Sequence, residues 1–148
     1  MDALKILFQD YIAYAGQLRE ETASIKSVLG LRDQEIYDSG HKTFDKAVEA
    51  WVEEFCREDH SQEVLMQALE VILFTAAGYE EKAPFWYLCA VQRHAAKLIP
   101  LLDEEHGVVL LEQFARQYSR GKLPIQREIQ KLLEKRYPKK KKGFLKFL

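Results

Sequence analysis

A chain of 148 residues has the length of one ordinary domain, and 47% apolar with 30% charged residues is the composition of a globular protein. These values exclude collagen-like, disordered and disulfide-stapled classes. Acidic residues such as Asp2 among the first apolar residues, and the lack of a basic start, disfavour a secretory signal, and no apolar run reaches the roughly 18 residues of a membrane span. We therefore expect a soluble cytoplasmic protein.

The net charge of -1 conceals a separation of charge along the chain. Residues 1–115 hold 10 basic and 21 acidic residues, whereas residues 116–148 hold 12 basic and 2 acidic residues. Such asymmetry indicates an anionic partner for the basic end, or acid-base contacts within one chain or between two copies. A homodimer is therefore one open alternative.

Apolar residues at helical spacing predict a first helix from Asp2 to about Leu29, with Gly30 as its stop. The mostly polar stretch 30–40 predicts a loop with room for one turn of helix. A second helix is expected from Thr43, a suitable N-cap, to about Arg57, and Asp45 suits its positive N-terminal end.

A third helix, capped by Asp59 or Ser61 and reaching about Ala77, has so few polar positions that we expect it in the middle of the fold. Proline and glycine then mark the bounds of three further helices. These helices are expected over 84–98, 103–119 with Gly121 as its stop, and 124–137, and Pro100 should interrupt the first of them or begin a new turn.

The fold class that follows is all-α, because no segment alternates polar and apolar residues as a strand does. Residues 1–138 are expected to form a single bundle of five to six mostly antiparallel helices, and residues 139–148 a flexible tail. Sliding the segment 43–77 onto 84–119 aligns only a few apolar positions. A short helical-repeat-like array is therefore the minority alternative.

Residue patterns for chemistry are sparse. None of the four histidines belongs to an HExxH or ExxH element, and the nearest approach is Asp103 with His106 at a helix start. No phosphate-binding glycine loop or nucleophile motif is present, and Cys56 and Cys89 fit buried free thiols. We expect no metal, no cofactor and no enzyme activity, with an enzyme whose active site the sequence does not reveal as the alternative.

Two clusters in the body are candidate binding residues. Aromatic residues around the fourth helix start suggest anchors in a partner groove: Tyr79, Trp86 and Tyr87. The favoured alternative places Phe85 and Trp86 in the core and Tyr87 at its boundary. Basic residues around Gly121 could converge on an anion or pair with acids of the negative half: Arg116, Arg120, Lys122 and Arg127.

The tail carries the strongest functional signal. A cationic run precedes four apolar residues that would share one face of a short helix: Lys139, Lys140, Lys141 and Lys142, then Phe144, Leu145, Phe147 and Leu148, with Lys146 opposite. This pattern fits an anionic membrane surface or a helix that docks in a protein groove. A frayed terminus, or apolar residues that fold back on the domain or on a second copy, is the alternative.

Together these observations predict a small non-enzymatic interaction or adaptor protein. Its basic C-terminal region would contact a protein partner or an anionic membrane, which would place it in the cytoplasm and at the membrane periphery. Association with nucleic acid is less favoured, because the body is acidic and no helix-turn-helix spacing is evident.

Overall fold

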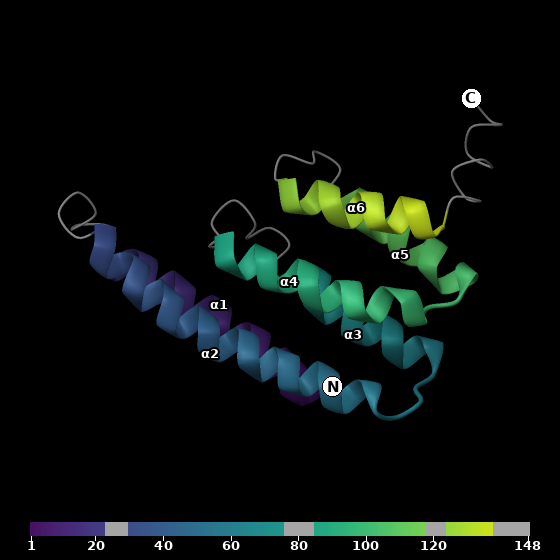
Figure 1. Cartoon of the computed structure of the whole chain (residues 1–148), viewed down its shortest axis with the longest axis horizontal. Coiled ribbons are helices and arrows are strands. Elements are labelled where there is room, and N and C mark those ends of the chain that lie inside the picture. The colour runs from purple at the N-terminus through teal and green to yellow at the C-terminus, as the bar shows by residue number, and fades with distance from the viewer. Residues whose placement is uncertain (23–29, 76–84, 118–123, 138–148) are drawn as a thin grey trace.

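The computed structural model describes residues 1–22, 30–75, 85–117 and 124–137, and within these ranges the chain is helical with no strand. Side chains are described for 1–14, 40, 42–75, 92–117 and 129–137. The helices are α1 (Asp2–Thr22), α2 (Gly30–Cys56), α3 (Gln62–Phe74), α4 (Phe85–Leu98), the short 3-10 helix η1 (Ile99–Leu101), α5 (Glu104–Gln117) and α6 (Pro124–Arg136) (Figure 1). The expected all-α fold is confirmed.

The helices form three pairs that stack on one another (Figure 1). Within a pair, α1 packs on α2, α3 on α4 and α5 on α6. Between pairs, α1, α3 and α5 pack in one layer, and α2, α4 and α6 pack in the other. The bundle is therefore a stack of helix pairs that follow one another in chain order. The helices of the first pair have 21 and 27 residues, whereas those of the other two pairs have 13 or 14.

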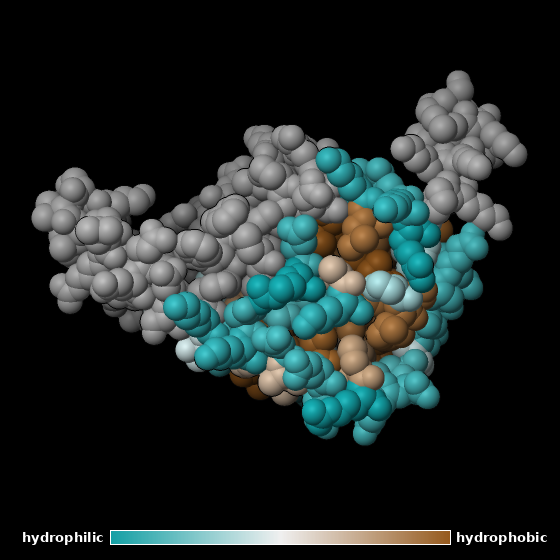
Figure 2. Space-filling view, viewed as in Figure 1, coloured by the Kyte–Doolittle hydropathy of each residue, from teal (hydrophilic) through white to brown (hydrophobic). Residues whose placement is uncertain are grey.

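The core runs continuously through all three pairs. α3 packs against α1, α4 and α5 and buries seven of its residues, so its expected central position is confirmed. Its exposed strip consists of Glu63, Gln67 and Glu70. Where α4 lies against α6, Figure 2 shows apolar side chains between flanking hydrophilic ones.

The prediction of a loop over 30–40 is wrong, because α2 begins at Gly30 and continues to Cys56 without a break. The prediction interpreted Gly40 as a loop residue, although it lies within α2. A Cβ atom at Gly40 would overlap the ring of Tyr14 on α1, so the residue serves close approach of two helices. Thr43 and Asp45 consequently lie inside α2 and not at its N-terminus.

Most other helix boundaries match the expectation. Ser61, one of the two expected caps, accepts a hydrogen bond from the backbone N–H of Val64 at 3.3 Å. Pro100 lies in η1, the new turn that follows α4. The expected boundary residues Leu29, Ala77, Ser119 and Gly121 lie outside the described residues.

The expected burial of Cys56 is wrong, since its thiol is exposed. Cys56 is the last residue of α2, and its neighbour Phe55 occupies the core position instead. The side chain of Cys89 lies outside the described residues.

Candidate functional site

The basic end of the chain is built on a helix that is firmly anchored at its last turn. Tyr137 is 4% exposed, and its hydroxyl donates a hydrogen bond to the Ile99 carbonyl at 3.1 Å. The ring lies against Gly107 of α5, where a Cβ atom would overlap it. Burial raises the pKa of Tyr137, so the phenol stays neutral and donates. The tail therefore begins, in the sequence, two residues after a fixed point.

α6 separates its apolar and basic residues onto different faces. Ile129 and Leu133 are buried, whereas Lys131, Lys135 and Arg136 are exposed. Arg136 also donates to the Pro100 carbonyl at 3.3 Å, which adds a second contact at the same end. The exposed cations of α6 thus lead along the sequence into the lysine run. The tail residues 139–148 lie outside the described residues.

Only part of the candidate anion cluster can be placed. Arg116 is exposed in the last turn of α5. It lines a depression of about 530 Å³ together with Glu70, Phe74, Gln113 and Gln117. The side chains of Arg120, Lys122 and Arg127 lie outside the described residues, as do the candidate groove aromatics Tyr79, Trp86 and Tyr87.

Sequence analysis did not predict the contact between a buried histidine of α4 and an aspartate of α2. His94 of α4 is 0% exposed, and its Nε2 lies 2.8 Å from Oδ1 of Asp45 in the middle of α2. The guanidinium of Arg93 donates to the same oxygen. No hydrogen-bond partner of His94 Nδ1 is found among the described residues. The two elements meet only in the folded chain, since 49 positions separate the pair.

The environment sets the charge of both groups. Burial lowers the pKa of His94 and outweighs the opposing effect of Asp45, so the imidazole is neutral at neutral pH. Burial raises the pKa of Asp45, but hydrogen bonds from His94 and Arg93 outweigh it and leave that pKa below its usual value. The pair is therefore a neutral imidazole that donates Nε2–H to a carboxylate, and it joins the first helix pair to the second.

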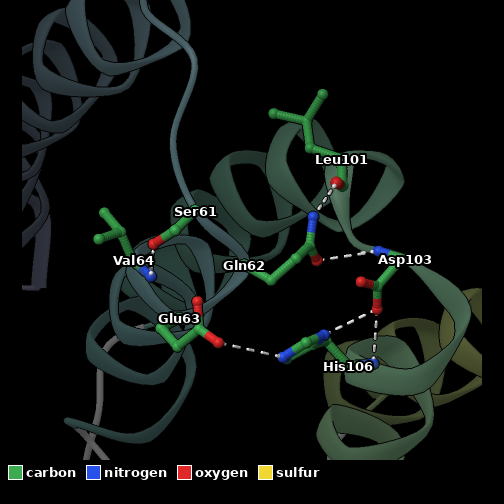
Figure 3. A network of polar contacts seen from close by, with 7 residues as sticks. All are labelled: Ser61, Gln62, Glu63, Val64, Leu101, Asp103 and His106. Carbon is green, nitrogen blue, oxygen red and sulfur yellow. Dashed lines mark hydrogen bonds and ion pairs between the residues drawn. The ribbon is translucent and has the colours of Figure 1, made fainter.

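A second polar network joins α3 to the start of α5 (Figure 3). The Gln62 side chain donates to the Leu101 carbonyl at 3.2 Å and accepts from the backbone N–H of Asp103 at 2.9 Å. Asp103 in turn accepts hydrogen bonds from the backbone N–H and Nδ1 of His106, at 2.9 and 2.7 Å. Asp103 is therefore the N-cap acceptor of α5, and the network fixes how the two helices start.

The close approach of Asp103 and His106 does not make a metal site. Glu63 lies 3.9 Å from Nε2 of His106, whereas Asp103 lies on the Nδ1 side of the same ring. The two carboxylates thus face different ring nitrogens and cannot converge on one cation. Among the described residues, no group of three or more candidate ligands could hold a metal ion.

A groove of about 390 Å³ lies between α1 and α2. Besides Asp10, its charged member, the groove is lined by aromatic, small and aliphatic residues: Leu7, Tyr11, Tyr14, Gly40, Thr43, Phe44 and Ala47. The ring of Tyr11 stacks on Phe44 at 4.2 Å between centroids. Sequence analysis did not predict this groove, because its residues come from two helices and a local pattern does not show which faces of two helices meet.

Comparison of the chain with protein-family models, with curated proteins and with solved structures found no match. Among the described residues, no helix combines the length and the apolar character needed to cross a membrane.

Proposed function

We propose that this chain is a non-enzymatic interaction protein whose basic C-terminal region associates with an anionic membrane surface. The observation that carries the proposal is the anchored, two-faced α6. Ile129, Leu133 and Tyr137 attach it to the body, and Lys131 and Lys135 remain exposed one turn apart. The run Lys139–Lys142 follows α6 in the sequence, so basic residues succeed one another from this helix into the tail.

The magnitudes support reversible binding. A lysine near an anionic bilayer contributes about 1 kcal/mol, so the four lysines of the run are worth roughly 4 kcal/mol before screening by salt. Phe144, Leu145, Phe147 and Leu148 would add apolar insertion if they form a helix on the surface. Stable peripheral membrane binding combines a basic cluster with inserting apolar side chains, and the sequence of this region contains both.

A non-enzymatic role is supported by the position of the described ionisable groups. His94 is buried and neutral, so its imidazole is not accessible to a substrate. The residues that line the α1–α2 groove and the α3–α5 depression include no histidine or cysteine. Their charged members are Asp10 in the groove, and Glu70 and Arg116 in the depression, so neither lining pairs a carboxylate with a second carboxylate or a histidine for acid-base catalysis.

Liposome sedimentation with the full chain tests the proposal. Vesicles of phosphatidylcholine with phosphatidylserine should sediment the protein at low salt, and binding should fall when salt is raised or phosphatidylserine is omitted. Replacing Lys139–Lys142 by glutamine should reduce the bound fraction about tenfold or more. Lys131→Gln with Lys135→Gln should reduce it less, because α6 adds to the tail and does not replace it.

The matched control is Lys42→Gln with Lys46→Gln, which removes two exposed charges from α2. This variant should sediment like the unaltered protein. Equal sedimentation of the unaltered protein and the tail variant would overturn the membrane proposal. A docking role in a protein groove is indicated instead if Phe144→Ala with Phe147→Ala abolishes capture of protein partners while lipid binding is absent. Salt-sensitive binding to duplex DNA would favour the nucleic-acid alternative.

A further inference from the structure

The contact between Asp45 of α2 and His94 of α4 lies at the junction of the first two helix pairs. α1 packs on α3 and α2 packs on α4, and these contacts attach the first pair to the second. The His94 side chain is 0% exposed, and its Nε2–H donates to Oδ1 of Asp45 at 2.8 Å. A buried ionisable group therefore lies where two parts of the fold meet, and the proposed membrane association does not use it.

The two ring nitrogens of His94 have different surroundings. Nε2 faces the Asp45 carboxylate, whereas Nδ1 is buried and has no hydrogen-bond partner among the described residues. An added proton binds at Nδ1, because Nε2 already carries one. It creates an N–H without an acceptor and a positive charge inside the fold, and both are unfavourable away from water. The closed contact therefore favours the neutral imidazole over the protonated one.

The charges around His94 do not offset the effect of burial. The Asp45 carboxylate favours an imidazolium, but Arg93 donates to the same oxygen of Asp45. Arg93 and Lys97 repel an imidazolium, and Lys97 also lies 4.0 Å from the Glu49 carboxylate of α2. The other helices that pack on α4 have charged residues at exposed positions, or half-buried in the case of Glu134: Glu63 and Glu70 of α3, and Lys131, Glu134, Lys135 and Arg136 of α6.

We propose that the α2–α4 contact at Asp45 and His94 is an acid-sensitive joint, and that uptake of one proton by His94 loosens the first helix pair from the second. When α2 separates from α4, the imidazolium gains access to water, so the open state accepts the proton that the closed state disfavours. Val48 and Val52 lie three and seven positions after Asp45 and share its side of α2. Both are buried in the closed state, so opening exposes apolar surface.

The direction of the pH dependence follows from this difference between the two states. In the open state His94 has the ordinary pKa of 6.5, whereas burial lowers that pKa in the closed state. The stability of the closed state is therefore complete above pH 6.5 and is lost as pH falls from 6.5 toward the lowered value. The lowered pKa of Asp45 keeps its carboxylate ionised over this range. The effect is opposite in sign to that of His106, whose pKa is raised.

Hydrogen exchange of the full chain, measured by mass spectrometry and corrected for the intrinsic exchange rate, tests this proposal. Between about pH 7.5 and about pH 5.5, peptides from α1 and α2 should lose protection several-fold, and up to about tenfold, because one proton is taken up. Peptides from α5 and α6 should not lose theirs. His94→Gln should remove this pH dependence, since its amide donates to Asp45 but does not titrate. The control is His106→Gln, the same substitution on α5, which should leave it unchanged.

A second variant keeps the test decisive if His94→Gln does not fold. Asp45→Asn retains an acceptor for Nε2–H but removes the carboxylate that favours the imidazolium, so its loss of protection in acid should be at least as large as in the unaltered protein. The proposal is overturned if α1 and α2 keep their protection in acid, if all helices lose it equally, or if His94→Gln loses it as the unaltered protein does. Liposome binding through the tail does not involve these residues, so the two proposals fail independently.

Discussion

At the scale of single residues, His106 is the titratable group with the clearest consequence for stability. Its hydrogen bond to Asp103 raises its pKa above the ordinary value of 6.5, and the charges of Asp103 and Glu63 act in the same direction. Asp103 has a lowered pKa for the reciprocal reason, since it accepts from the backbone and side chain of His106. The folded chain therefore favours the imidazolium–carboxylate contact over the neutral imidazole more than the unfolded chain does.

The sign of the pH dependence follows from the direction of the His106 shift. A raised pKa in the folded state contributes stability that is complete below 6.5 and is lost as pH rises through the raised value. Urea unfolding of the unaltered protein and of His106→Gln should therefore differ most at mildly acidic pH and converge at alkaline pH. In Asp103→Asn, an NMR titration should return the pKa of His106 toward its ordinary value. A pKa at or below that value in the unaltered protein would contradict this prediction.

At the same scale, the role that the sequence predicts for Asp45 differs from its role in the structure. Its position near the expected start of a helix predicted an interaction with the helix dipole. In the structure it lies in the middle of α2 and accepts from His94 and Arg93 instead. Its partners are set by the way α4 packs on α2, and nothing within the local sequence specifies that packing.

At the scale of helices, two glycines each leave space for a tyrosine ring, and the two rings differ in how much room they have to move. Gly40 accommodates the Tyr14 ring and Gly107 accommodates the Tyr137 ring. Tyr14 is 37% exposed, so its ring has solvent to move into, whereas Tyr137 is buried and held by its hydroxyl to Ile99. The helix α2 thus depends on its glycine less than the contact between α5 and α6 does.

The two glycines consequently respond differently to the same substitution. Gly107→Ala should destabilise the protein by about 1–3 kcal/mol, because the added methyl overpacks a fixed ring. Gly40→Ala should be close to neutral or should stabilise by up to about 1 kcal/mol, since alanine favours the helix. Urea midpoints of both variants measure the difference. Equal effects would show that both rings move equally well.

At the scale of the whole molecule, the central pair α3/α4 packs against both other pairs, so we expect a change in its core to affect the stability of the whole fold. Leu69 of α3 is 0% exposed, and α3 packs on α1, α4 and α5. Leu69→Ala should lower the free energy of unfolding by about 2–5 kcal/mol, as large-to-small changes in a core do. Leu101→Ala is the matched control, because Leu101 is 48% exposed in η1. Unfolding monitored by far-ultraviolet circular dichroism and by tryptophan fluorescence should remain coincident, and an equal loss in both variants would contradict a shared core.

The sequence by itself determined the features that depend on near neighbours along the chain. Helical spacing, the cap at Ser61 and Pro100 predicted the all-α class and most boundaries, because each of these signals acts within about one turn. Tertiary structure alone decided the stacking of the pairs, the continuation of α2 through Gly40, the Asp45–His94 contact and the α1–α2 groove. Each of these joins residues of different helices, and a local pattern contains no information about which helix lies opposite.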